Sequence, residues 1–231
     1  MNYIYWNGKN SKDIKGLIIC ELPPITKPQV RIKETVIEGV DGSIIEELGY
    51  ESYDKTIAIG LRIGANIDEI TEYFTGSGEI IFSNEPNKYY RAQIIKGIDY
   101  SRLSRYRVAK VTFRVQPFKY DNEETELYNI GSNQEITVPN IGNYFSKPLI
   151  TIKGSGIVEL RVNGNLICQY EFPEGDDTVI LDSEKQDAYW GDKLKNRTMV
   201  GDFPIFEKGA NVISWSGTVT QVKIKRYSRW L

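Results

Sequence analysis

The glycine-rich loops are the first candidates for chemistry in this chain. Gly76-Ser77-Gly78 and Gly154-Ser155-Gly156 have the Gly-x-Gly spacing with which several phosphate-binding loops begin. Neither motif continues to a third glycine or to the Gly-Lys-Ser/Thr that would cradle a phosphate. We predict instead that both are turns between strands, because glycine adopts a positive φ without steric strain.

Composition limits nucleophile and metal chemistry. The 231 residues include no histidine, which removes the commonest general base near pH 7 and the commonest metal ligand. Cys20 and Cys168 are the two cysteines, too few for a disulfide framework or for zinc-ligand spacing. We predict that both are small buried hydrophobic residues in a reducing compartment.

Carboxylates are frequent, but their pattern does not indicate catalysis. A glycosidase needs two carboxylates that face each other across a groove. The densest group falls on one predicted hairpin and is typical of a solvated face: Glu34, Glu38, Asp41, Glu46 and Glu47. Asp176, Asp177 and Asp182 resemble a calcium site, but their spacing is not that of an EF-hand loop. We therefore predict no catalytic residue, no cofactor and no metal.

One basic cluster lies in the first half of the chain. Its members are Lys96, Arg102, Arg105, Arg107, Lys110 and Arg114, with Tyr100 and Tyr106 among them. Basic residues interleaved with aromatic rings occur in nucleic-acid grooves. The net charge of −2, however, does not demand a polyanionic partner. The cluster is more typical of the outer face of a hairpin, with an interface or channel lining as its use in an assembly.

Aromatic residues of the second half are candidates for sugar binding. Lectins stack sugars on aromatic faces, and the candidates here are Trp190, Trp215, Tyr170 and Tyr189. Most of them are expected in the core instead, because aromatic side chains dominate the cores of small sandwiches. Trp190 and Trp215 are the two that we identify for a sugar or partner contact.

The composition predicts that strands position these residues. Apolar content of 40% with 12% aromatic residues excludes a disordered chain, and the many Tyr, Trp, Ile, Val and Thr favour strands. No apolar run approaches the ~18 residues of a membrane helix, and the N-terminus has no signal-peptide core. We expect a soluble chain made in the cytoplasm, with two domains, residues 1–128 and 129–231, that meet near the acidic stretch 121–126.

The first domain is predicted to be β-rich and sandwich-like, with one helix and a long hairpin. Asn66 caps a helix over residues 66–75, Glu69 completes a capping box, and Gly76 ends the helix. Residues 28–38 alternate as a strand, and Asp41-Gly42 turns the chain back. That strand places Val30, Ile32 and Val36 on one face.

The second domain is predicted to be an antiparallel jelly roll. Seven or more short strands in about 100 residues, punctuated by Gly, Asn and Pro, favour such a sandwich. Asn163-Gly164 between two strands is typical of a type I′ hairpin.

Several segments, in this order and spacing, resemble the phage distal tail protein family. In the first half these are Asn7-Gly8, the capped helix and residues 38–44, 82–94 and 112–120; in the second half they are residues 140–156, 180–184 and 201–231. The resemblance implies a ring-forming N-terminal domain and a galectin-like or carbohydrate-module-like jelly roll outside the ring. It implies no catalytic residue. It also implies that the long hairpin is a belt that embraces a neighbouring subunit.

The resemblance thus implies a structural virion protein at the tail tip, assembled in the host cytoplasm. Its partners would be further copies of itself in a hexamer, the tail tube protein, the tail-tip hub protein, the tape-measure protein and receptor-binding protein, with DNA in transit through the channel and no membrane. The interface residues that we predict are Val30, Ile32, Val36, Asp41, Gly42 and Ile44. A carbohydrate-binding module or lectin-like adsorption protein is the alternative, and a glycosidase is a second rival.

Overall fold

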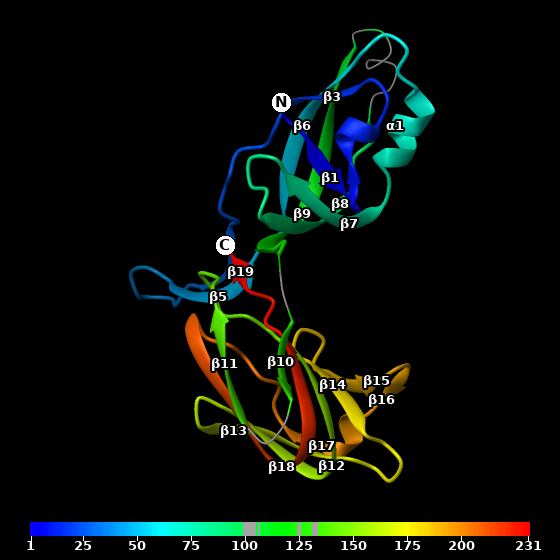
Figure 1. Cartoon of the computed structure of the whole chain (residues 1–231). Helices are drawn as coiled ribbons and strands as arrows, with labels where there is room; N and C mark the ends of the chain where they lie inside the picture. Colours follow the sequence, from blue (N-terminus) through cyan, green and yellow to red (C-terminus); the bar gives the residue numbers. More distant parts are fainter. Residues whose placement is uncertain (99–104, 106, 124–125, 131–133) are drawn as a thin grey trace. The chain divides into compact units, whose positions relative to one another are not determined.

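The computed structural model describes residues 1–98, 105, 107–123, 126–130 and 134–231 (Figure 1). These residues form two compact units, Met1–Asn122 and Glu123–Trp230. Strands dominate both units, so the predicted mainly β fold class is confirmed. The boundary expected after residue 128, with a separate role for each domain, stays a prediction.

The first unit is built on one curled antiparallel sheet. Its strands are β1 (Ile4–Trp6), β2 (Lys9–Asn10), β3 (Leu17–Glu21), β6 (Tyr53–Leu61), β7 (Ser77–Phe82), β8 (Lys88–Ile94) and β9 (Val108–Asp121). They are ordered β2-β1-β7-β8-β9-β6-β3, and a short 3-10 helix, Ser11–Asp13, follows β2. β9 is long enough to pair with β6 through its first half and with β8 through its second half. The sheet therefore wraps around one core.

Helix α1 (Ile67–Tyr73) packs on the inner face of this sheet. The Asn66 side chain accepts a hydrogen bond from the Asp68 amide at 3.0 Å, so the predicted cap is confirmed. Ile70 and Phe74 are buried on the face of α1 that meets the sheet. Their partners in the core include Trp6 and Phe113, which come from β1 and β9.

A two-stranded sheet projects from the first unit (Figure 1). It consists of β4 (Val30–Thr35) and β5 (Ile44–Tyr50), which pair with each other in antiparallel register. The predicted hairpin is thus confirmed, but its first strand ends at Thr35, before Val36. Residues 36–43 form a longer connection than the tight Asp-Gly turn that the sequence favoured.

The second unit is a set of antiparallel strands around its own core. The strands are β10 (Leu127–Ile130), β11 (Glu135–Asn140), β12 (Leu149–Val162), β13 (Asn165–Glu171), β14 (Thr178–Asp182), β15 (Asp187–Trp190), β16 (Lys193–Leu194), β17 (Met199–Gly201) and β18 (Gly209–Lys225), and a 3-10 helix spans Asn196–Thr198. Their order is β10-β18-β12-β14-β15-β16; β11 also pairs with β18, β13 with β12, and β17 with β13. The likeness of this unit to galectins stays a prediction.

One glycine site in the second unit, residues 154–156, differs from the sequence prediction of a turn between strands. Residues 154–156 do not end a strand, because β12 continues through them with register shifts. A Cβ on Gly154 would lie 2.3 Å from the Thr218 carbonyl oxygen, and one on Gly217 would lie 2.2 Å from that of Ile157. These glycines therefore let two long strands cross closely while they bend. The Asn163-Gly164 turn is confirmed, since both residues have positive φ between β12 and β13.

The two cysteines have different environments. Cys168 is buried in the core of the second unit, as predicted, and burial raises its thiol pKa to about 12. Cys20 is exposed, which contradicts the prediction, because it lies on the outer side of the sheet-edge strand β3. Over the described ranges, no helix has the length and apolar character needed to cross a membrane.

Candidate functional site

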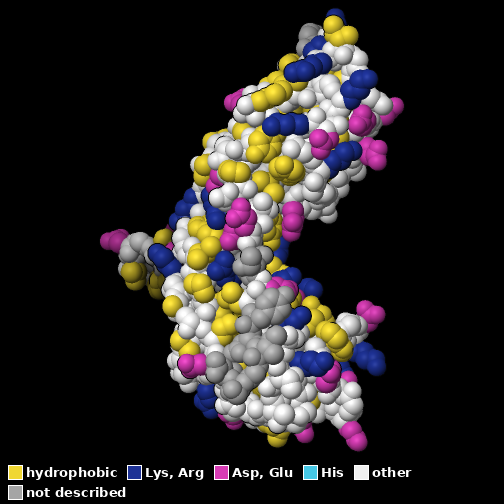
Figure 2. Space-filling view, viewed as in Figure 1, with side chains coloured by type: hydrophobic (Ala, Val, Ile, Leu, Met, Phe, Trp, Pro, Cys, Tyr) yellow, Lys and Arg dark blue, Asp and Glu magenta, His cyan; other side chains and the backbone are white. Residues whose placement is uncertain are grey.

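The β4–β5 hairpin is the strongest candidate site because both of its faces expose apolar side chains. The cross-strand pairs Ile32–Glu47 and Glu34–Ile45 lie on one face, which we call the acidic face. The pairs Lys33–Glu46 and Thr35–Ile44 lie on the other. Figure 2 shows hydrophobic side chains on this projecting segment.

Of the six predicted interface residues, the apolar ones beyond Val30 are widely exposed. Ile32 is 52% exposed, Ile44 60% and Val36 73%, whereas Val30 is half-buried at the root of the hairpin. Asp41 and Gly42 are exposed in the connection, where Gly42 has φ +87°. Exposed apolar side chains concentrated on one projecting element are typical of a protein interface.

The structure separates residues that the sequence placed together and adds others. Ile32 and Ile44 lie on opposite faces, and Val36 lies outside the strand. Ile45 shares the acidic face with Ile32 as its diagonal neighbour; it is 59% exposed and was not among the predicted residues. Strand alternation alone misses Ile45 because the length of the connection decides which β5 residue faces which β4 residue.

The root of the hairpin is held by short-range contacts. The Glu51 amide donates to the Gln29 carbonyl at 2.8 Å, and the Arg31 guanidinium donates to the Leu48 carbonyl at 3.1 Å. The rings of Tyr50 and Phe118 meet edge to face at 5.9 Å. The exposed Lys33–Glu46 ion pair, at 3.7 Å, adds little because solvent screens it.

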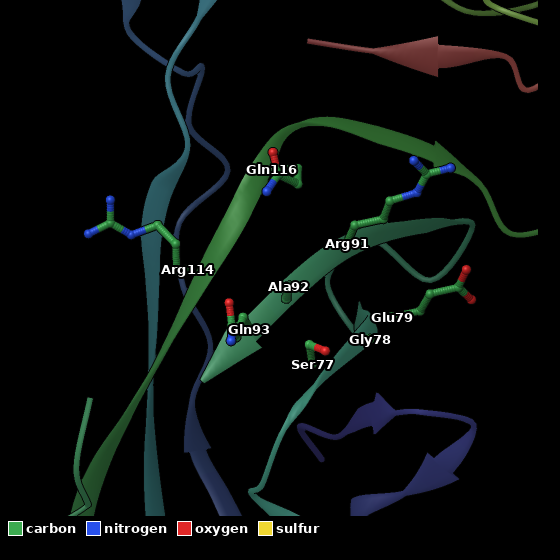
Figure 3. Close-up of a pocket in the computed structure, with 8 residues that line it drawn as sticks. All are labelled: Ser77, Gly78, Glu79, Arg91, Ala92, Gln93, Arg114 and Gln116. Atoms are coloured by element: carbon green, nitrogen blue, oxygen red, sulfur yellow. The ribbon is translucent and has the colours of Figure 1, made fainter. Parts of the chain in front are cut away.

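A hollow of about 550 Å³ lies on the outer face of the sheet (Figure 3). Its lining residues are Ser77, Gly78, Glu79, Arg91, Ala92, Gln93, Arg114 and Gln116. A second hollow of about 490 Å³ shares Arg114 and Gln116 with it and reaches the hairpin root at Arg31 and Tyr50. The side chains of Arg91 and Arg114 extend in opposite directions (Figure 3), so they do not form a joint anion site.

The predicted basic cluster is partly neutralised within the first unit. Lys96 and Arg114 both bind Asp54, with N–O distances of 2.6 Å each, and the hydrogen bond from Lys96 is the main cause that lowers the pKa of Asp54. Arg107 donates to the Arg62 carbonyl, and Arg105 and Lys110 are exposed. Arg102, Tyr100 and Tyr106 lie outside the described residues. The cations that are described fit a solvated outer face better than a nucleic-acid groove.

Trp190 and Trp215 do not form a common surface. Trp215 is 5% exposed and packs in the core of the second unit, so its ring offers no face to a sugar. Trp190 is 47% exposed on β15, next to the turn to β16. Tyr170 is also buried, at 1% exposure, which leaves Trp190 and the half-buried Tyr189 for the lectin-like alternative.

The described residues contain no group of three or more Cys, Asp or Glu side chains that could hold a metal ion. Asp176, one member of the calcium candidate, instead pairs with Lys195, and Asp177 with Lys153 at 3.1 Å. Asp182 accepts hydrogen bonds from the Glu184 and Lys185 amides, both at 3.1 Å. The three carboxylates therefore serve separate structural contacts.

Comparison with known proteins gives a match in structure alone. No protein-family model matches the chain, and no curated protein matches its sequence. The solved structure of the phage SPP1 Dit (gp 19.1) protein matches 100% of this chain and 100% of its own, at 13% identity and a TM-score of 0.69. A structure of the phage p2 baseplate in its activated conformation with Sr matches 96% of this chain and 97% of its own, at 10% identity and a TM-score of 0.48. The same baseplate with Ca matches 98% of both chains, at 11% identity and a TM-score of 0.47. The resemblance to phage distal tail proteins is thus confirmed as a likeness of fold, and this chain has the fold of the SPP1 Dit protein along its whole length.

Proposed function

We propose that this chain is a structural protein of a phage tail tip, a distal tail protein whose copies form a ring, as a hexamer. The observation that carries the proposal is the fold likeness to the SPP1 Dit protein over 100% of both chains. That protein is described as a paradigm of the hub adsorption apparatus in phages that infect Gram-positive hosts. The ring joins the tail tube to the tip or baseplate and holds receptor-binding components.

The hairpin supports self-association as the mechanism. Its two strands pair with each other and with no third strand among the described residues, so the outer edge of each can accept a further strand from another copy. Ile32, Ile44 and Ile45 supply apolar area on its two faces. A contact of this kind is head-to-tail. It closes into a ring when a whole number of the rotations that relate neighbouring copies makes one full turn.

The proposed protein works through assembly geometry and has no catalytic step. Its first domain contacts the tail tube on one side and the tail-tip hub on the other, and the ring leaves an axial passage for tape-measure protein and DNA. The second domain is a peripheral site for receptor-binding protein. The proposed location is the tail tip of the virion, with assembly in the host cytoplasm.

A charge placed in the hairpin tests the proposal. We expect Ile45→Lys to raise the concentration for half-assembly by tenfold or more, because burial of one isoleucine is worth roughly 1.5–3 kcal/mol and 1.4 kcal/mol is tenfold in affinity. Mass photometry across concentration measures the effect on the purified full-length chain.

Ile63→Lys is the matched control, since Ile63 is an exposed isoleucine of the same unit outside the hairpin. It should leave the assembly unchanged. The proposal is wrong if the original chain stays monomeric at high micromolar concentration, with or without tail-tip partners. The hairpin assignment is wrong if both variants assemble like the original chain.

A further inference from the structure

The segment that leads into the hairpin is held by side chains rather than by a strand ladder. Residues 22–29 connect β3 to β4 and have no regular secondary structure. Three of their carbonyl groups accept side-chain hydrogen bonds: Pro23 from Asn84 at 3.0 Å, Pro24 from Lys55 at 3.0 Å, and Thr26 from Tyr53 at 3.4 Å. We call these three contacts the clasp. They fix the backbone immediately before the hairpin begins.

Lys55 is the buried member of the clasp. It lies on β6 in line with Ile57 and Ile59, whose side chains face the core, and it is 2% exposed. Its Nζ atom lies 4.9 Å from the ring centroid of Tyr90, 5.6 Å from that of Tyr53 and 5.7 Å from that of Phe82. An ammonium group thus occupies a position where the alternation of β6 calls for an apolar side chain.

The charges around Lys55 come from three strands and the β7–β8 turn. Glu85 accepts a hydrogen bond from the Tyr90 hydroxyl at 2.5 Å and pairs with Lys119. The charge of Lys88 interacts with those of Asp121, Lys119 and Glu85. Burial lowers the pKa of Lys55 from its ordinary 10.5 to about 8, Glu85 opposes this shift, and Lys119 adds to it. Burial raises the pKa of Tyr53 to about 12, and the pKa of Tyr90 is raised as well.

A lysine with a lowered pKa weakens the folded state at neutral pH. Its charged form is favoured in the unfolded chain, so an apolar side chain of similar shape would serve global stability better. What the ammonium provides at this position is a donor for the Pro24 carbonyl, which an apolar side chain cannot replace. The contact therefore serves the position of the segment and not the stability of the unit.

We propose that Lys55 is a positioning residue that sets the direction in which the β4–β5 hairpin leaves the first unit, through its hydrogen bond to the Pro24 carbonyl. The effect of Lys55 on the direction of the hairpin depends on the clasp alone. Any effect on assembly rests on the proposed function. Without the bond, the clasp keeps only the hydrogen bonds from half-buried Tyr53 and exposed Asn84. The hairpin then samples a wider range of directions while both strands stay paired.

Spin-label distances on the full-length chain test this proposal. Labels at Asp41→Cys and Ile63→Cys, in a Cys20→Ser background, report the direction of the hairpin against the core. Cys168 does not interfere, because its buried thiol has a raised pKa. An excess of unlabelled chain removes distances between copies. We expect Lys55→Met to broaden the distance distribution at least twofold at pH 7, with no fall in melting temperature.

Lys12→Met is the matched control, since Lys12 is an exposed lysine 4.2 Å from the Tyr3 ring in the same unit. Its distribution should stay as narrow as that of the original chain. A narrow distribution in Lys55→Met, or a melting temperature below that of Lys12→Met, overturns the proposal. If the distribution broadens but the original chain never assembles, the positioning role stands and the proposed function fails.

The pH dependence of stability gives a second readout. Between about pH 8 and pH 10.5 the unfolded chain binds more protons at Lys55 than the folded chain, so this residue makes the free energy of unfolding rise with pH across that window. We expect denaturant unfolding to show that Lys55→Met loses this rise, while Lys12→Met keeps it. Equal slopes in all three chains would contradict the buried-ammonium assignment.

Discussion

A chain in which residues 30–47 are replaced by a tight turn is expected to remain folded and to lose its assembly. The two hairpin strands pair with each other, and no residue from this segment belongs to the core of the first unit. Removal therefore deletes exposed apolar area without opening a cavity. Loss of Ile32, Ile44 and Ile45 alone, at roughly 1.5–3 kcal/mol each, would weaken association by about a thousandfold or more.

Light scattering with mass photometry measures this loss directly. Circular dichroism and the melting temperature serve as controls for folding, and both should match those of the original chain. A shortened chain that still runs at ring mass would refute the hairpin as the assembly element. A shortened chain that unfolds would show that the hairpin contributes to the core in a way that its exposure does not indicate.

Phe113→Ala is expected to cause the largest loss of stability among single changes in the first unit. Phe113 is fully buried, and its ring lies 5.2 Å from that of Trp6, 6.2 Å from Phe82 and 6.3 Å from Phe74. These rings come from β1, β7 and the end of α1, so one cavity would affect all three elements. Truncation of a buried phenylalanine typically costs about 3–5 kcal/mol.

Denaturant unfolding of the full-length chain, followed by amide exchange in β9, measures this change. Ile63→Ala is the control, because a side chain that is 94% exposed leaves no cavity, and its effect should stay within about 0.5 kcal/mol. A cost below about 1 kcal/mol for Phe113→Ala would mean that the core collapses around the missing ring. The curled sheet would then be less tightly packed than its burial indicates.

Local signals in the sequence predicted local structure well. Asn66 caps α1 as its type and position indicate, and Asn163-Gly164 forms the expected turn. Both depend on neighbours within four residues. The glycines at 154–156 were misread because their role depends on β18, which crosses them from more than 60 residues away. When the contacting strand is that far away in sequence, local pattern cannot distinguish a glycine that ends a strand from one that lets another backbone approach.

The candidate site was predicted in position but not in detail. Alternation and Asp41-Gly42 located the hairpin, yet the strand end at Thr35 and the pairing of Ile32 with Glu47 set its faces. Ile45 was missed for that reason. Lys55 was missed because a lysine in a strand normally signals a solvated side, and nothing nearby in sequence reveals that Pro24 and three aromatic rings enclose it.

The two glutamates of the acidic face affect which contacts two free hairpins can make. Glu34 and Glu47 alternate with Ile32 and Ile45, so two hairpins that meet face to face in the wrong arrangement bring like charges together. Repulsion of this kind opposes such wrong contacts, and dissolved salt weakens it by screening. If copies associate as proposed, we expect higher ionic strength to lower the concentration at which they do so through this face.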